Sequence, residues 1–238
     1  MPWKEVTKGM KNEITYRVWG RNALFTDPVT KIGGEKSSLS IPTPESIKGI
    51  TESIYWKPSI IWIVDEIRIM NPIQMEGKGI RPVGLEGNDL ARYTYLRNVE
   101  YQVRVHFEFN QNRPNLQQDW NENKHYFIAK RCLEAGGRRD IFLGTRECQA
   151  YIEPVEFGSG VGAYDKIDMD FGLQYHSIGY PDETRDDQLL VRFWYPQMRR
   201  GRIRCCRPEN CPKSRFIRKA ARKTFSPQVN FSYAQEEW

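Results

Sequence analysis

A lysine and a histidine stand side by side in the segment NENKHYFIAK (residues 121–130), and together they could act on a phosphate. Asn121 or Asn123 can cap a helix here, which would place Lys124 and His125 in its first turn. The first turn of a helix carries unpaired N–H donors and a partial positive charge, so it disfavours cations and attracts anions. A phosphodiester bound there would meet those donors, an ammonium group and an imidazole that titrates near neutrality.

These groups would be sufficient to cleave RNA without a metal, because RNA supplies its own nucleophile, the 2′-hydroxyl. The reaction needs a base for the hydroxyl proton, a cation for the developing phosphorane and an acid for the leaving 5′-oxygen. The alternative is structural: His125 aligns with Ala129 and Cys132 and can simply pack at the edge of a core. The local sequence leaves both interpretations open.

Other familiar catalytic signatures are missing from the sequence. It contains no G-x-x-x-x-G-K-[ST] phosphate loop, no H-E-x-x-H motif and no carboxylate cluster with two-metal spacing. The segment CCRPENC (205–211) has three cysteines but no second C-x-x-C and no histidine nearby in the sequence, so we expect no zinc site. The sequence therefore predicts neither a metal nor a cofactor, and a metal-dependent DNA nuclease is disfavoured.

Two glycine-rich segments are candidates for holding a phosphate backbone, because flexible backbone beside cations can wrap around one. One is AGGRRD, directly after the Lys-His helix, and the other is KIGGEK (31–36). The alternative for the first is a plain helix stop with exposed arginines. The candidate RNA contacts are Lys31, Gly33, Gly34, Lys36, Gly136, Gly137, Arg138 and Arg139.

The basic charge is concentrated near the end of the chain. Residues 198–223 hold eleven Lys or Arg against Glu209 alone, whereas the other residues hold 25 bases and 29 acids. Segment 199–223 therefore predicts contact with RNA, DNA or another partner; a solvated or disordered end is the alternative. Five irregularly spaced cysteines and the lack of an apolar N-terminal segment favour a cytoplasmic protein, and no apolar run is long enough for a membrane span.

Hydrophobic periodicity predicts a strand at 13–20, a helix at 44–56, strands at 59–70 and 98–109, a helix at 122–135 and a strand at 140–152. Residues 71–97 carry prolines and glycines that indicate a loop or hairpin insertion. The order strand, helix, strand, strand, helix, strand is that of the ferredoxin-like (RRM-like) α+β fold, an antiparallel sheet with both helices on one face. The strand at 98–109 lacks the aromatic signature of the RNA-recognition motif.

Long stretches of the sequence resemble a known family. The runs ALFTDPVTKIGGEK, ESIYWKP, NPIQMEGKGIRP, KHYFIAKR, AGGRRDIFLGTRECQAYIEP and YPDET closely resemble the subtype I-C CRISPR-associated pre-crRNA endoribonuclease, in the fifth Cas family of the RAMP superfamily. The resemblance covers roughly residues 12–212. It implies a ferredoxin-like domain at 12–154 and a small antiparallel β-sheet C-terminal domain with a basic tail at 155–225.

The resemblance also implies an activity and its residues. It implies metal-independent cleavage at the base of the CRISPR repeat hairpin, a 2′,3′-cyclic phosphate product, and retention on the crRNA 5′ handle within the type I-C interference complex. The partners would be the backbone and large subunits of that complex and its target DNA. The implied catalytic residues are Tyr55, Lys124 and His125. Either Tyr55, if Lys124 lowers its pKa, or His125 could be the base; the alternative function is a non-catalytic handle-binding subunit.

Overall fold

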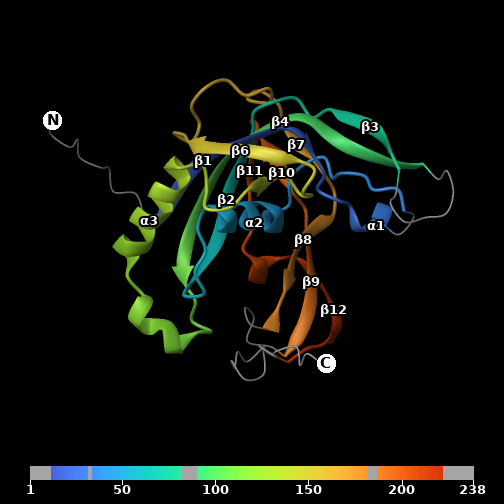
Figure 1. The fold of residues 1–238 in the computed structure, drawn as a ribbon. Helices are drawn as coiled ribbons and strands as arrows, with labels where there is room; N and C mark the ends of the chain where they lie inside the picture. The colour runs from blue at the N-terminus through green and yellow to red at the C-terminus, as the bar shows by residue number, and fades with distance from the viewer. Residues whose placement is uncertain (1–11, 32–33, 82–89, 182–186, 222–238) are drawn as a thin grey trace, which may run out of the picture.

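The computed structural model describes residues 12–31, 34–81, 90–181 and 187–221, which form a mixed α/β fold of mostly antiparallel sheets (Figure 1). The elements that carry the site are β1 (Glu13–Ala23), α1 (Pro28–Lys31), α2 (Pro44–Ile54), β2 (Ile60–Ile69), β3 (Met75–Ile80), β4 (Ala91–Phe109), the 3-10 helix η1 (Pro114–Asp119), α3 (Glu122–Glu134), β5 (Ile141–Phe142) and β6 (Gln149–Pro154). They are followed by β7 (Met169–Asp170), β8 (Gln174–Gly179), β9 (Gln188–Trp194), β10 (Gln197–Arg199), β11 (Arg202–Arg204), η2 (Pro208–Asn210) and β12 (Lys213–Lys219).

The larger sheet has the strand order β5-β6-β1-β4-β2-β11-β10-β7, with β3 paired to β4. Within it, β1 pairs antiparallel with both β4 and β6, and β4 pairs antiparallel with β2. Of the two alternatives predicted for 71–97, a loop or a hairpin, the structure shows the hairpin, because β3 pairs antiparallel with the first residues of β4. The strand β4 is therefore much longer than its predicted span.

The helix α2 forms where the sequence predicts it. The hydroxyl of Thr43 caps it by accepting a hydrogen bond from the Ser46 N–H at 3.1 Å, and Pro44 occupies its first turn. Its apolar stripe of Ile47, Ile50 and Ile54 is buried. The helix ends at Ile54, two residues before the predicted end, and Tyr55 is extended. That extended residue turns the chain toward β2.

The helix α3 is likewise set by local signals at both ends. The side chain of Asn121 accepts a hydrogen bond from the N–H of Lys124 at 3.0 Å, which fixes the N-terminus. At the other end Gly136 and Gly137 have φ values of 83° and 102°, and their N–H groups bond to the carbonyls of Leu133 and Cys132. These two hydrogen bonds form a Schellman motif, which gives the predicted end of the helix a defined geometry.

The strand β4 shows the predicted alternation on one face only. Its apolar residues Val103, Val105 and Phe107 are buried as expected. However, Gln102 and His106 on the face predicted to be polar are also buried. Gln102 accepts a hydrogen bond from the Gly158 N–H at 2.8 Å, because the segment following β6 lies across that face.

Arg68 on β2 holds this covering segment to the sheet. Its buried guanidinium donates to both carboxylate oxygens of Asp165 at 2.8 and 2.9 Å and to the carbonyls of Ser159 and Gly160. The N–H of Gly162 and the charge of Arg68 keep the pKa of the Asp165 carboxyl below its usual value. This carboxyl therefore stabilises the fold above its ordinary pKa, and the contribution is lost as pH falls through the lowered value.

We expect Arg68→Met to lower the free energy of unfolding by about 3 kcal/mol, because the two carbonyls and the partly exposed Asp165 carboxylate lose a buried donor. Urea unfolding at neutral pH measures the change. The matched control is Arg92→Met on β4, where the arginine is exposed and the change should be within about 0.5 kcal/mol. Equal unfolding midpoints for the two variants would contradict this role for Arg68.

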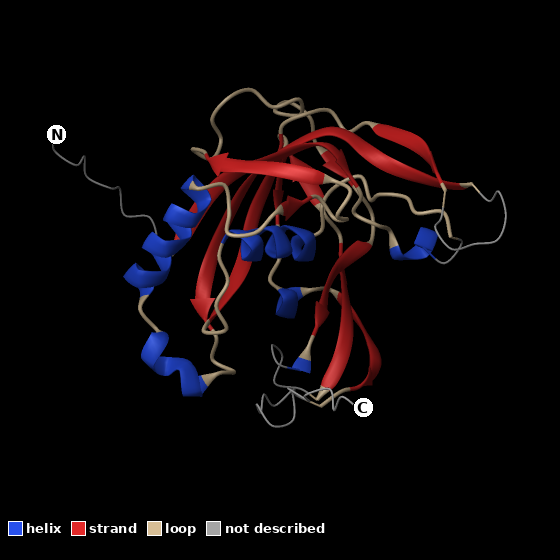
Figure 2. Cartoon of the chain, in the orientation of Figure 1, coloured by secondary structure: helices blue, strands red, loops and turns tan. Residues whose placement is uncertain are grey.

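The second half of the chain contributes to both sheets. Strands β7, β10 and β11 continue the larger sheet, because β11 pairs antiparallel with β2. Strands β8, β9 and β12 form a separate antiparallel sheet, which Figure 2 shows extending away from the larger one. The expected small β-sheet thus corresponds to these three strands alone, while a domain boundary near residue 155 stays a prediction. Within the described residues, no helix is long and apolar enough to cross a membrane.

Candidate active site

Tyr55, directly after α2, and His125, at the start of α3, meet inside the molecule. The hydroxyl Oη of Tyr55 lies 2.8 Å from Nδ1 of His125, and the ring centroids are 5.9 Å apart. Tyr55 is the C-terminal cap of α2 and His125 is in the first turn of α3, two helices that contact each other. The structure therefore brings together two residues separated by 70 positions.

The hydrogen bonds of His125 define its tautomer. Its Nε2 lies 2.8 Å from the carbonyl oxygen of Asp119, which can only accept, so Nε2 carries a proton. In the neutral imidazole Nδ1 is then an acceptor, and the hydroxyl of Tyr55 donates to it. The pair is thus arranged as Tyr55 O–H to Nδ1 and Nε2–H to the Asp119 carbonyl.

Lys124 lies beside this pair but at the surface, with 48% of its side chain exposed. Its ammonium forms an ion pair with the carboxylate of Asp119, and the other oxygen of that carboxylate accepts a hydrogen bond from Ser59 Oγ at 2.5 Å. Two hydrogen bonds lower the pKa of the Asp119 carboxyl, and the one from Lys124 has a larger effect than the one from Ser59. Asp119 therefore stays ionised and joins the lysine to the histidine.

The ionisation of Tyr55 decides between the two candidate bases. Burial, and next the nearby charge of Asp119, raise the pKa of Tyr55 to about 12, although Arg138 acts in the opposite direction. Lys124 is paired with Asp119 rather than with the phenol. Tyr55 consequently stays protonated at neutral pH, and the route in which Lys124 converts it to a free base is disfavoured.

Both members of the pair are fully buried, so His125 also fits the structural interpretation. Its ring packs edge-on against Phe107 and Phe109, with centroids 5.9 and 6.2 Å away. Trp120 stacks on Phe109 at 5.5 Å. The segment from η1 to Trp120 therefore closes the site, and sequence reasoning did not identify its Asp119.

The glycine-arginine segment after α3 lies near this site. The backbone N–H groups of Arg138 and Arg139 both donate to the carbonyl of Ser53 at 3.1 Å. The two side chains line a pocket of about 330 Å³ together with Trp56 and Lys57, the residues that follow Tyr55. Arg138 and Arg139 are therefore placed beside the candidate catalytic residues.

The other glycine-rich segment lies elsewhere. Gly34 has φ 81° and is exposed, and the ammonium of Lys36 lies 5.1 Å from the Tyr93 ring of β4. Lys31 ends α1, which Figure 1 shows at the opposite side of the molecule from α3. Gly33 lies outside the described residues. These residues do not join Tyr55 and His125 in one cluster.

The basic segment 199–223 is partly neutralised within the protein. Arg199 donates to Asp170 at 2.7 Å, and Arg207 forms an ion pair with Glu108. The strand β12, in contrast, is exposed along its whole length and carries Lys213, Arg215, Arg218 and Lys219. Arg222 and Lys223 lie outside the described residues. Arg202 and Arg204 on β11 are exposed as well, so the exposed cations of this segment lie on both β11 and β12.

Comparisons with known proteins agree with this architecture. Residues 13–206 match the family model described as CRISPR-associated protein Cas5, in its Cas5d form. A curated protein from Mannheimia succiniciproducens, CRISPR pre-crRNA endoribonuclease Cas5d, is 40% identical over 200 residues, covering 72% of this chain and 87% of that protein. A protein with the same description from Thermus thermophilus is 28% identical, covering 75% and 79% respectively.

Two solved structures have a similar fold. A crystal structure of a CRISPR-associated protein has a TM-score of 0.74 at 32% identity, and covers 85% of this chain and 96% of that chain. A functionally uncharacterized protein from Streptococcus mutans, SMU1763c, has a TM-score of 0.73 at 35% identity with the same coverage. The chain therefore belongs to the Cas5 family of CRISPR-associated proteins, in the Cas5d group.

Proposed function

We propose that this protein is an endoribonuclease that cuts CRISPR precursor RNA at the base of the repeat hairpin. The reaction is attack by the 2′-hydroxyl without a metal, and it leaves a 2′,3′-cyclic phosphate. The observation that carries the proposal is the hydrogen bond between Tyr55 and His125, with the ammonium of Lys124 beside them. Support also comes from the two curated relatives, both of which are described as pre-crRNA endoribonucleases.

The scaffold for this chemistry is a ferredoxin-like core made of β1, α2, β2, β4, α3 and β6. Its support is the antiparallel order β6-β1-β4-β2, which is the order of a split βαβ unit. In this arrangement the end of the first helix and the start of the second can meet over the sheet. The proposed site lies at that meeting point.

Tyr55 and His125 act together as a proton relay. The 2′-hydroxyl gives its proton to Tyr55 Oη while the tyrosine proton moves to Nδ1 of His125, so the tyrosine need not ionise first. The imidazolium then gives its Nε2 proton to the leaving 5′-oxygen and ends as the other neutral tautomer. Lys124 stabilises the charge on the phosphorane.

Substrate entry requires a movement of the segment from η1 to Trp120. In the free protein the Nε2–H of His125 donates to the carbonyl of Asp119, and both Tyr55 and His125 are buried. RNA phosphate would compete with the Asp119 carboxylate for Lys124, and withdrawal of Asp119 frees the Nε2 proton for the leaving oxygen. The exposed Trp56, with Lys57, Arg138 and Arg139, provides an adjacent aromatic and cationic surface for the RNA.

After cleavage the protein stays on the crRNA 5′ handle as a subunit of the type I-C interference complex. Its partners there are the backbone and large subunits and the target DNA. The exposed cations of β12 are suited to contact either the crRNA or the target DNA, since both are polyanions.

A second candidate is a subunit that binds the handle without cutting it. The observation that favours it is the complete burial of Tyr55 and His125 in the free protein. Repeat RNA incubated with the purified protein distinguishes the two. The nuclease gives a shortened product ending in a cyclic phosphate, whereas the scaffold gives a tight complex with intact RNA.

We expect Lys124→Ala to slow cleavage by about 10²-fold, at the lower end for loss of a charge-stabilising donor because the lysine is half exposed to water. Single-turnover cleavage and filter binding measure the rate and the affinity separately. Lys130→Ala, an exposed lysine on the same helix, is the matched control. If both substitutions slowed cleavage equally, Lys124 would contribute only non-specific electrostatic attraction of the RNA and would not stabilise the phosphorane.

A further inference from the structure

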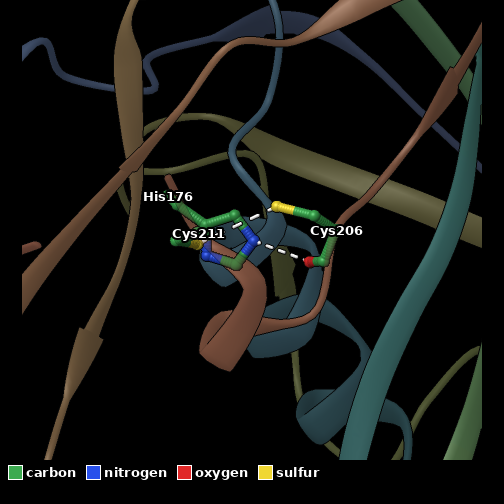
Figure 3. A group of neighbouring side chains, drawn as sticks. All are labelled: His176, Cys206 and Cys211. Atoms are coloured by element: carbon green, nitrogen blue, oxygen red, sulfur yellow. Dashed lines mark hydrogen bonds between the residues drawn. The ribbon is translucent and has the colours of Figure 1, made fainter. Parts of the chain in front are cut away.

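Three potential metal ligands converge between the two sheets (Figure 3). His176 is on β8, Cys206 follows β11, and Cys211 directly follows η2. One ligand atom from each lies within 4.8 Å of the others. The sequence places no histidine close to CCRPENC along the chain, but the fold brings His176, 30 residues before Cys206, next to it.

The distance between the two sulfurs fits two ligands of one metal ion better than a disulfide bond. Sγ of Cys206 and Sγ of Cys211 are 3.8 Å apart. Two thiolates bound to one tetrahedral zinc at about 2.3 Å stand about 3.8 Å apart, which is the edge of that tetrahedron. A disulfide would require about 2.05 Å.

The histidine is buried and held in position. Its Nδ1 lies 2.9 Å from Oγ of Ser177, and its Nε2 lies 3.0 Å from the carbonyl oxygen of Cys206. The ring also packs edge-on against Trp194, with centroids 5.4 Å apart. The carbonyl of Cys206 can only accept, so Nε2 carries the proton and Nδ1 is the nitrogen with a lone pair. A metal bound at Nδ1 would replace the hydrogen bond from Ser177, while Nε2–H would still hold the ring, which is the usual arrangement of a metal-binding histidine.

We propose that His176, Cys206 and Cys211 bind a zinc ion. Two thiolates and an imidazole are ligands that zinc prefers, and its tetrahedral shell would be completed by water or an exogenous ligand. Among the described residues no fourth His, Cys, Asp or Glu joins the group. The site is separate from Tyr55, Lys124 and His125 and does not depend on the proposed nuclease function.

The ion would cross-link the smaller sheet to the segment that follows β11 of the larger sheet. His176 belongs to the smaller sheet, whereas Cys205, adjacent to Cys206, donates its N–H to the Asp65 carbonyl of β2 in the larger one. Cys211 lies two residues before β12, the exposed cationic strand. Zinc would therefore fix the position of β12 relative to the larger sheet.

The test is metal analysis of the full chain, purified without chelator and dialysed against metal-free buffer. We expect about one zinc per chain, a rise in Tm on adding Zn²⁺ to the stripped protein, and a Co²⁺ adduct with the absorption bands of tetrahedral thiolate coordination. Cys206→Ser and His176→Asn should lose the bound metal. Cys132→Ser, which removes a half-buried cysteine outside the group, should keep it.

The wild-type measurements keep the test decisive even if a variant fails to fold. Wild-type protein that holds no zinc, gives no tetrahedral Co²⁺ spectrum and shows no change in Tm with Zn²⁺ would overturn the proposal. So would a mass lower by two hydrogens with Cys206 and Cys211 found in one disulfide-linked peptide under non-reducing conditions, since the pair would then be a redox pair. Cleavage of RNA is not among these readouts, so the two proposals fail independently.

Discussion

His125→Gln should slow cleavage of repeat RNA by about 10⁴-fold, the upper end for general acid–base catalysis, because one imidazole serves both proton transfers. Glutamine retains a donor and an acceptor but cannot exchange protons at neutral pH. The side chain is fully buried in the free protein, so RNA affinity should change little. Single-turnover rates and equilibrium binding on the same RNA give the two quantities.

The matched control for His125 is His106→Gln. His106 is also buried and hydrogen-bonded, to Asp65 at 2.8 Å, but it lies on the opposite face of β4 from Phe107, which contacts His125. The hydrogen bond to Asp65 raises the pKa of His106, so the control loses stability mainly at low pH, where the wild-type imidazolium is present. Equal loss of cleavage in both variants, at matched folded fractions, would contradict a catalytic role for His125.

Tyr55→Phe is expected to slow cleavage by about 10³-fold, because the ring remains but the hydroxyl that passes the proton to His125 is lost. Tyr16→Phe is the control for packing and stability, since Tyr16 is also buried and shares a 2.8 Å hydrogen bond with Thr51 on the same helix, α2. Both variants should lose similar stability in urea. Only the change at Tyr55 should slow cleavage.

The pH dependence separates a relay from a free tyrosinate base. Since the pKa of Tyr55 is raised to about 12, the phenol is protonated throughout the neutral and mildly alkaline range. The cleavage rate should therefore show no tyrosine ionisation between roughly pH 8 and 10, where an ordinary tyrosine begins to titrate. A rising limb in that range that disappears in Tyr55→Phe would mean that RNA binding lowers the tyrosine pKa and that Tyr55 is the base.

Much of the core could be predicted from local signals. The Thr43 cap with Pro44, and the glycines after α3, mark helix ends that depend only on neighbouring residues. The alternation in β4 predicted its buried face for the same reason. The burial of Gln102 on the other face could not be predicted, because the segment that covers it lies more than 50 residues away.

The candidate site was predicted in two different ways. Lys124 and His125 stand out because cations at a helix N-terminus need a reason, whereas Tyr55 could be singled out only from the resemblance to a known family. Asp119 was missed, since a single carboxylate in a polar loop has no local signature. The cluster of His176 with two cysteines was missed because its spacing exists only after the two sheets fold together.

The most direct test is cleavage of the cognate repeat RNA in EDTA, with an all-ribose substrate and one carrying a single 2′-deoxy at the scissile nucleotide. Attack by the 2′-hydroxyl predicts that only the all-ribose RNA is cut, and that its product ends in a 2′,3′-cyclic phosphate. Tight binding of both RNAs without cleavage would contradict the account and leave a handle-binding subunit. Activity lost in EDTA and restored by Mg²⁺ but not by Zn²⁺ would contradict it in another way, by indicating a metal-dependent nuclease.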